Sequence, residues 1–228
     1  MKNRRKENSY TVIGTWIIVG FVILATVGGI IGVAFNASNS QNSNFTATTV
    51  PPITASDWSQ GNANAKVTLI EYGDFQCPAC AAYKPILKQV IAAYGDRIQF
   101  VFRNFPLYQV HEDADLAAKT AEAAGLQGKY WEMFDMLYDK QTTWSLLPLG
   151  LGVKSAYESY ASSLGLDVKK LDADIDSAQV KQKIQTDVDG GNAAQIDHTP
   201  TFFVNLKQIP NPTSYDQFKS VIDAALAQ

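Results

Sequence analysis

The sequence is poor in the two residue types that most often bind metals or carry redox chemistry. Its 228 residues include two cysteines, Cys77 and Cys80, and two histidines, His111 and His198. A closed structural zinc site needs about four ligands, and the histidines lie far apart without paired spacing, so we expect no metal and no other cofactor. A structural disulfide is disfavoured too, because so short a loop removes little entropy from the unfolded chain. A lone cysteine pair at this spacing is typical of a redox dithiol.

Charged residues are absent from the segment 12–35, which is dominated by apolar residues and glycine. About 20 such residues in a helix cross a hydrocarbon core about 30 Å thick, so the sequence predicts a transmembrane anchor here. Basic residues precede it and stay on the cytoplasmic side, which places 1–11 in the cytoplasm and the rest of the chain outside it. A cleaved signal peptide is the alternative, but its apolar region is usually about 7 to 15 residues and ends in small residues, which fits poorly near Phe35.

Charge is also missing from 36–56, a stretch rich in Asn, Ser and Thr. Its apolar content is too low to bury a core, so we predict a flexible linker. The remainder, 57–228, is long enough for one domain with a hydrophobic core. The whole chain has a formal net charge of −3, and the domain without the basic N-terminus is more acidic still. Nucleic acid is therefore excluded as a partner, because its phosphates need a basic surface.

The apolar residues follow patterns that predict alternating strands and helices. Two segments rich in β-branched and aromatic residues, 66–72 and 97–102, predict strands, and a helix over 79–94, interrupted at Pro85, lies between them. Together they form a βαβ unit. Helical spacing predicts further helices near 116–124, 130–138, 153–164, 171–175, 178–194 and 215–227.

A last strand is predicted from Thr199 to Val204, just before the closing helix. Pro200 stands at its start. A proline that opens a strand beside an active site is a candidate for the cis form of the peptide bond.

Three separate segments resemble the DsbA-like thiol:disulfide oxidoreductases. They run from Glu71 to Cys80, from Arg103 to Leu107 and from Thr199 to Asn205, and they agree with that family in order and spacing. The resemblance implies an α/β protein with a thioredoxin fold and a helical insertion at about 111–195, which agrees with the order of predicted elements. Membrane-anchored members resemble this succession of anchor, linker and redox domain.

Cys77 comes where a strand is followed by a helix. A helix N-terminus offers free N–H groups and partial positive charge, which stabilise a thiolate, so we predict that Cys77 is the reactive sulfur. Pro78 suits the first helical position, where its missing N–H would be unpaired anyway. Cys80 lies about one turn further along the same side, where a shielded resolving thiol is expected.

Four further residues gain roles from the resemblance. Glu71 matches the family's buried acid, which carries protons for the shielded cysteine; the alternative is a surface carboxylate on an edge strand. Arg103 is expected either to pair with Glu71 or to meet solvent. Thr199 and Pro200 match the loop that faces the cysteines and receives the substrate as an added strand.

Some neighbours of the cysteines are expected to modulate the redox potential. The dipeptide Pro78-Ala79 lacks the histidine of the family's strongest oxidants, so the resemblance does not fix the potential. His198 stands where a small residue is common. If the Thr199 loop faces Cys77, a protonated His198 would stabilise the thiolate; the alternative is that His198 points into solvent.

The sequence thus predicts a membrane-anchored, extracytoplasmic enzyme that oxidises cysteine pairs through Cys77 and Cys80. The resemblance implies reduced secreted or cell-envelope proteins as substrates, and a membrane quinone-linked thiol oxidase as the partner that reoxidises the pair. Two alternatives stay open. One is a disulfide reductase or isomerase, and the other is a tethered binding protein whose cysteines form an inert disulfide.

Overall fold

The computed structural model describes residues 48–148 and 151–228. Within them one mixed sheet has the strand order β1-β3-β2-β4-β5. β2 and β3 are parallel, and the other neighbouring pairs are antiparallel. The strands are β1 (Trp58–Gly61), β2 (Val67–Gly73), β3 (Ile98–Asn104), β4 (Thr201–Val204) and β5 (Lys207–Ile209).

The central strands β2 and β3 are buried almost throughout. Their register pairs Glu71 with Phe102 and Tyr72 with Arg103. Since successive side chains of a strand point to opposite faces, Glu71 and Phe102 face one side of the sheet, and Tyr72 and Arg103 face the other. This alternation separates Glu71 from Arg103, for which a pairing was one of two expectations.

Each face of the sheet has its own hydrophobic cluster. The larger cluster joins the sheet to α2 (Pro78–Tyr94), to α9 (Tyr215–Leu226) and to helices inserted between β3 and β4; its sheet residues include Leu69, Phe100, Phe102 and Phe202. The smaller cluster, on the other face, contains Ile70, Tyr72, Val101 and Phe203 together with Val50. The sheet is therefore covered on both sides, as expected for buried parallel strands.

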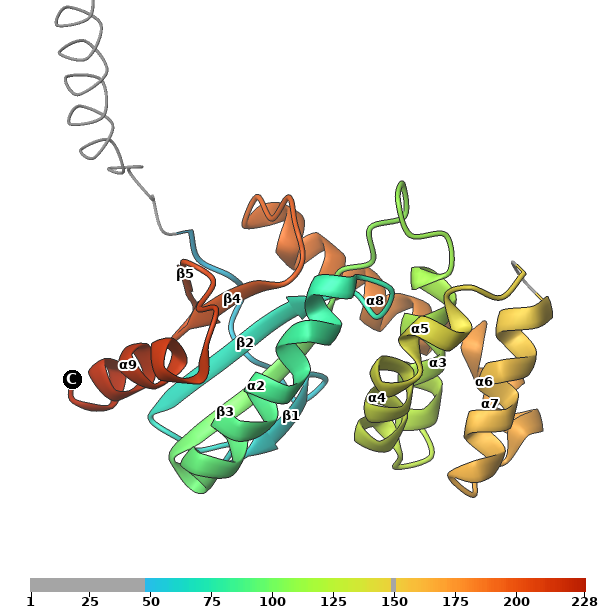
Figure 1. Cartoon of the computed structure of the whole chain (residues 1–228), viewed down its shortest axis with the longest axis horizontal. Helices are drawn as coiled ribbons and strands as arrows, with labels where there is room; N and C mark the ends of the chain where they lie inside the picture. Colours follow the sequence, from blue (N-terminus) through green and yellow to red (C-terminus); the bar gives the residue numbers. More distant parts are fainter. Residues whose placement is uncertain (1–47, 149–150) are drawn as a thin grey trace, which may run out of the picture. The chain divides into compact units, whose positions relative to one another are not determined.

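The helices between β3 and β4 form what we call the helical block, residues 114–193. Figure 1 shows most of the block beside the sheet, with α2 lying across the sheet. Contacts of α8 with β3 and of α4 with α2 join the block to the sheet domain. Its members are α3 (Ala114–Gly125), α4 (Tyr130–Asp139), α5 (Gln141–Trp144), α6 (Leu151–Ser163), α7 (Val168–Ile175) and α8 (Ala178–Ala193).

Pro85 does not interrupt α2, contrary to expectation. The helix is continuous from Pro78 to Tyr94 with Pro85 inside it. Pro85 is exposed, so water can reach the carbonyl group that loses its N–H partner. Packing of Cys80 before the proline, and of Leu87, Val90 and Tyr94 after it, in the core holds the helix together on both sides.

Part of the expected linker belongs to the domain. Of 36–56 the structure describes 48–56, and Val50 in this segment is buried. The Val50 N–H donates to the carbonyl of Leu206 at 3.1 Å, and Thr49 forms an isolated bridge with Lys207. These backbone contacts add the segment to the sheet at β5, so it is packed rather than free.

The expected transmembrane segment 12–35 lies outside the described residues. None of the helices in 48–148 and 151–228 is long and apolar enough to cross a membrane.

Candidate active site

Cys77 is the N-cap residue of α2, at the end of a short turn after β2. Its N–H donates to the Asp74 carbonyl at 3.1 Å. Gln141 of α5 holds the turn from the other side, because its Nε2 donates to the carbonyls of Phe75 at 2.8 Å and Cys77 at 2.9 Å. The turn is therefore fixed by both the sheet domain and the helical block.

The Cys77 thiol is strongly acidified. Its pKa is lowered to about 5, and the largest cause is a hydrogen bond from the Cys80 side chain. The Thr199 side chain and the backbone N–H groups of Cys80 and Ala79 lower it further, whereas burial opposes them. The two N–H groups belong to the first turn of α2, where they have no helical acceptor. Cys77 is thus a thiolate at neutral pH.

Cys80 has the opposite character. Its side chain is buried in the core, and burial, followed by the hydrogen bond to Cys77 and the charge of Glu71, raises the pKa of Cys80 well above its ordinary value. Both cysteines are free thiols in this structure, so it represents the reduced form. The pair consists of one acidified cysteine at the start of α2 and one shielded thiol deeper in the core.

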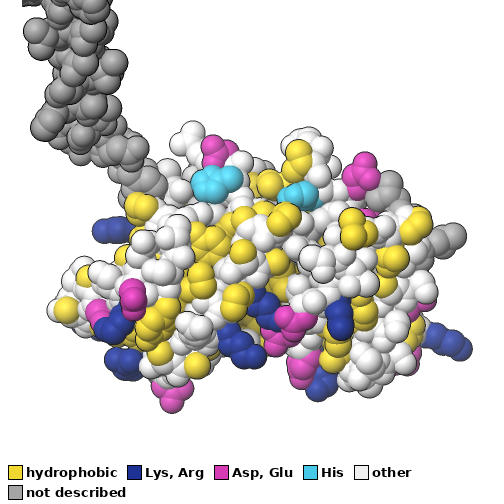
Figure 2. Space-filling view, in the orientation of Figure 1, with side chains coloured by type: hydrophobic (Ala, Val, Ile, Leu, Met, Phe, Trp, Pro, Cys, Tyr) yellow, Lys and Arg dark blue, Asp and Glu magenta, His cyan; other side chains and the backbone are white. Residues whose placement is uncertain are grey.

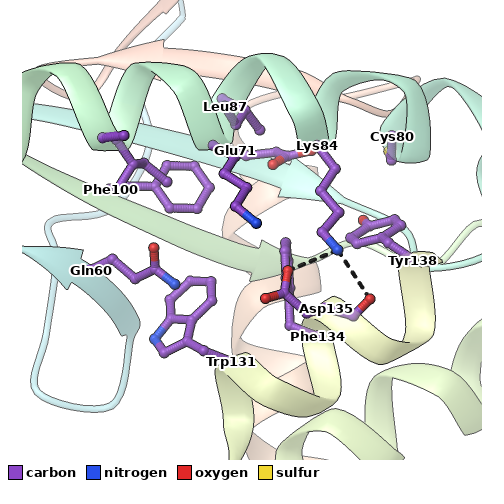
Figure 3. Close-up of a pocket in the computed structure, with 13 residues that line it drawn as sticks. Gln60, Glu71, Cys80, Lys84, Leu87, Phe100, Trp131, Phe134, Asp135 and Tyr138 are labelled. Atoms are coloured by element: carbon purple, nitrogen blue, oxygen red, sulfur yellow. Dashed lines mark hydrogen bonds and ion pairs between the residues drawn. The ribbon is translucent and has the colours of Figure 1, made fainter.

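Glu71 lies on β2 with only 1% of its surface exposed. Burial, and then the charge of Cys77, raise the pKa of Glu71 to about 8. Its Oε2 atom has no hydrogen-bond partner among the described residues. Glu71 and Cys80 line the same cavity (Figure 3), so the carboxyl group is a buried acid beside the shielded cysteine and not an edge-strand surface group.

The loop before β4 faces the cysteines. The peptide bond between Thr199 and Pro200 is cis, as expected. The Sγ atom of Cys77 lies 3.3 Å from the Thr199 carbonyl oxygen, to which the protonated thiol donates, and both Thr199 and Pro200 are buried. Cys77, Cys80, Glu71, Thr199 and Pro200 therefore come together, although they span more than half of the described chain.

Arg103 takes neither of its two expected positions. It is 4% exposed and lies on the face of the sheet opposite Glu71. Its guanidinium group pairs with Asp57 and donates to Tyr72 Oη and to the carbonyls of Pro51 and Pro52. Arg103 therefore fixes the segment before β1 and has no contact with the cysteines.

The structure also distinguishes the two histidines. His198 is exposed, with 56% of its side chain accessible, and its Nδ1 pairs with the exposed Asp197 at 2.6 Å. His111 instead lies 2.7 Å from Oδ2 of Asp74, a fully buried carboxylate that begins the cysteine turn. Sequence reasoning missed Asp74, Gln141 and His111 as supports of the site. Asp74 stands within the motif that carries the resemblance, whereas nothing in the sequence marks Gln141 or His111.

The described residues contain no group of three or more His, Cys, Asp or Glu side chains placed to hold a metal ion.

Comparison with solved structures identifies the same fold elsewhere. The oxidised BdbD of Bacillus subtilis matches with a TM-score of 0.66 and 25% identity, over 80% of this chain and 99% of that one. The α-DsbA1 of Wolbachia pipientis matches with a TM-score of 0.66 and 20% identity, over 77% of this chain and 93% of the other. A thioredoxin-like oxidoreductase from Silicibacter pomeroyi matches with a TM-score of 0.65 and 24% identity, over 77% of this chain and 95% of that one.

Curated relatives share a similar stretch within much longer proteins. The Na(+)/H(+) antiporter NhaA 1 of Mycolicibacterium gilvum is 36% identical over 160 residues, which are 68% of this chain but 24% of that protein. The same-named protein of Salinispora arenicola is 34% identical over 75% of this chain and 25% of its own length. The chain thus spans about a quarter of these relatives, and their name describes those longer proteins.

A family model described as thioredoxin matches residues 54–224, which covers every described strand and all but the end of α9. With the acidified Cys77 beside a shielded Cys80, this match and the similarity to BdbD support dithiol-disulfide exchange. The chain therefore belongs to the thioredoxin family, as a DsbA-like thiol:disulfide oxidoreductase.

Proposed function

We propose that this protein oxidises cysteine pairs in other proteins, with Cys77 as the reactive sulfur and Cys80 as the resolving sulfur. The observation that carries this proposal is the lowering of the pKa of Cys77 to about 5. A more stable thiolate is a better leaving group and makes the disulfide more oxidising. A lowered pKa of the reactive cysteine is typical of oxidising members of this fold, which supports the oxidising direction.

The reaction begins with the enzyme disulfide. A substrate thiolate attacks Sγ of Cys77, a new S–S bond forms, and the Cys77–Cys80 bond breaks with Cys80 leaving as a thiolate. A second substrate thiolate then attacks the substrate sulfur of this mixed disulfide and releases Cys77 as its thiolate. Two electrons pass from the substrate to the enzyme, and a substrate disulfide is formed.

Glu71 supplies the proton that the departing Cys80 needs. With a pKa of about 8, the carboxyl group is mostly protonated at neutral pH. The raised pKa of Cys80 favours its neutral thiol. The proton therefore moves from Glu71 to Cys80 when the disulfide opens, and it returns when the pair is reoxidised.

The substrate segment binds as an added strand along the Thr199-Pro200 loop. Support comes from the 3.3 Å contact between Cys77 Sγ and the Thr199 carbonyl, which sets a backbone segment directly beside the reactive sulfur. Strand addition uses backbone hydrogen bonds and tolerates many sequences, which suits an enzyme with diverse substrates. Pro78 and Ala79 are exposed next to the sulfur and line the approach.

The reaction takes place outside the cytoplasm, with the chain anchored by 12–35 and 1–11 on the cytoplasmic side. The absence of charge from 12–35 and the basic residues before it support this arrangement. The substrates are reduced secreted or cell-envelope proteins. A membrane quinone-linked thiol oxidase restores the disulfide between Cys77 and Cys80.

The direct test mixes the oxidised full-length chain, in mild detergent, with a reduced unfolded protein that contains one cysteine pair. We expect the enzyme disulfide to disappear in equal amount to the substrate disulfide formed, and the redox potential to be more oxidising than that of thioredoxin, about −270 mV. Absence of transfer, or a potential at or below that of thioredoxin, contradicts the proposal. A Cys77→Ala, Cys80→Ala double variant is the control for spontaneous oxidation.

A further inference from the structure

A cavity of about 240 Å³ lies between α2, the sheet and α4, and Cys80 and Glu71 both line it. Most of its wall is apolar or aromatic, with Leu87, Phe100 and Trp131 among the lining residues. Among its polar lining residues, Glu71 has a buried oxygen, Oε2, with no hydrogen-bond partner among the described residues. A cavity of this size has room for several water molecules, and a buried carboxyl oxygen requires a hydrogen-bond partner.

Lys84 connects the two helices that border this cavity. Its Nζ lies 2.8 Å from Oδ1 of Asp135 and 2.7 Å from Oδ1 of Asp139, and it donates to the Asp135 carbonyl at 3.1 Å. The Lys84 side chain is 12% exposed, whereas those of Asp135 and Asp139 are 56% and 65% exposed. The ammonium group therefore lies between the interior and the solvent.

The figures show the same arrangement from two distances. In Figure 3, Lys84 reaches from α2 to Asp135 on α4, while Glu71 and Cys80 lie toward α2. In Figure 2, basic and acidic side chains meet on the surface at the border between α2 and the helical block. Lys84 is four residues after Cys80, one helical turn away on the same side of α2.

We propose that Lys84, through its ion pairs with Asp135 and Asp139, closes the route by which Glu71 exchanges protons with bulk water, and so acts as a positioning residue for disulfide exchange. This inference rests on the proposed proton-carrying role of Glu71. It adds a control on the route by which the proton of Glu71 reaches bulk water, a route that a buried carboxyl group needs after each turnover.

Lys84 acts on Glu71 through water access and not through its charge. Two carboxylates within 2.8 Å already balance the ammonium group. Burial is the largest cause that raises the pKa of Glu71, and Lys84 is not among the causes. The titratable groups near Glu71 come from α2 and α4; they are Cys77, Cys80, Tyr83, Lys84, Lys88, Tyr130, Asp135 and Tyr138.

Removal of the ion pairs therefore hydrates the cavity and lowers the pKa of Glu71 toward its ordinary value. A lost positive charge would have the opposite effect on a carboxyl group. The direction of the shift thus separates water access from electrostatics.

The step to measure is the attack of Cys80 on a mixed disulfide at Cys77. Treatment of the reduced full-length chain with 5,5′-dithiobis(2-nitrobenzoate) joins thionitrobenzoate to Cys77 and releases one equivalent. The Cys80 proton then passes to ionised Glu71, the Cys77–Cys80 bond forms, and a second thionitrobenzoate leaves as a coloured thiolate. The rate of this second release should rise with pH through the pKa of Glu71.

We expect Lys84→Met to move the midpoint of this pH profile to lower pH by about one unit. Lys88→Met is the matched control: Lys88 also lines the cavity on α2, is exposed and has no ion pair within the described part of the chain, so its profile should match the wild type. Lys84→Arg keeps the ion pairs and should restore the midpoint. An unmoved midpoint in Lys84→Met, or one moved to higher pH, overturns the inference.

A Glu71→Gln variant separates this inference from the proposed function. If Glu71 carries the proton, Glu71→Gln removes the titration near pH 8 and adding Lys84→Met changes nothing more. If Glu71→Gln keeps the wild-type profile, the proton role fails, and with it the inference. If Glu71→Gln removes the titration but Lys84→Met matches the wild type, only the closing role of Lys84 fails.

Discussion

Arg103 holds Asp57 in a two-pronged ion pair on the face of the sheet opposite Glu71. The Nε–Oδ1 distance is 2.9 Å, the Nη2–Oδ2 distance is 3.0 Å, and about 5% of either side chain is exposed. The same guanidinium group donates to the carbonyls of Pro51 and Pro52. Arg103 therefore holds the segment before β1 against strand β3.

This geometry predicts that Arg103→Met destabilises the domain strongly. Loss of Arg103 leaves the buried Asp57 carboxylate with only the more distant Lys183 Nζ, at 3.8 Å, as a counter-charge. Removal of one partner of a buried ion pair typically lowers the free energy of unfolding by about 3 to 5 kcal/mol. Arg97→Met, at an exposed arginine, should change the free energy of unfolding by less than about 0.5 kcal/mol. Chemical unfolding of the full-length chain measures both values. Similar effects of the two variants would contradict a structural role for Arg103.

Substitution of single cysteines should reveal which sulfur meets the substrate. In Cys80→Ala the resolving sulfur is gone, so mixed disulfides with reduced substrate proteins should accumulate through Cys77. In Cys77→Ala the remaining Cys80 is buried and its pKa is raised, so few should form. Non-reducing electrophoresis after trapping counts the adducts, and equal trapping by both variants would reverse the assignment.

The acidified Cys77 also predicts how stability depends on pH. An unfolded cysteine has a pKa of about 8.5 and folded Cys77 one of about 5, so the thiolate stabilises the reduced fold fully above about pH 8.5. This contribution decreases as the pH falls and is lost below about pH 5. The free energy of unfolding of the reduced chain, measured relative to that of the oxidised chain, should follow this trend. A difference between the two that is constant with pH would contradict a stabilised thiolate at Cys77.

Thr199 should help to stabilise the Cys77 thiolate. Its hydroxyl group is buried and has no hydrogen-bond partner among the described residues, and the Thr199 side chain is among the causes that lower the pKa of Cys77. Thr199→Val keeps the shape and removes the hydroxyl, so the pKa of Cys77 should rise by about one unit. Titration of the thiolate absorbance measures the shift, with Thr186→Val on the exposed side of α8 as the control. An unchanged titration would assign the low pKa to the helix N-terminus and Cys80 alone.

The local parts of the fold could be predicted from the sequence. β2, α2 and β3 follow from dense runs of β-branched, aromatic and helix-forming residues, and the cis bond at Pro200 follows from a proline at the start of a strand. β1 and β5 could not be found, because four residues around Trp58 and three around Gln208 form strands only by pairing with distant neighbours. Short strands carry too little pattern for recognition.

The same limit explains the errors at the site. The partner of Arg103 is 46 positions away in the sequence, and the choice between Asp57 and Glu71 depends on which face of β3 the side chain occupies. That choice is fixed by the register of β2 and β3, which a strand pattern does not give. Gln141 lies in a four-residue helix, and only the folded chain brings it to the cysteine turn.

The two histidines provide the last prediction, in which His111 and not His198 supports the active site. Nδ1 of His111 lies 2.7 Å from Asp74 Oδ2, and the Asp74 carbonyl accepts the Cys77 N–H. In His111→Ala a fully buried carboxylate loses a hydrogen bond, which typically lowers the free energy of unfolding by about 1 to 3 kcal/mol, and the cysteine turn loosens. His198→Ala removes an exposed side chain and should change the free energy of unfolding by less than about 0.5 kcal/mol.

Unfolding of both variants, combined with the thionitrobenzoate release rate between about pH 5 and 8, tests this contrast. We expect His198→Ala to match the wild-type rate at every pH, because its imidazole pairs with Asp197 at the surface. We expect His111→Ala to be slower, because Cys77 is held less firmly against Cys80. A pH-dependent change in His198→Ala, or unchanged stability and rate in His111→Ala, would return the modulating role to His198.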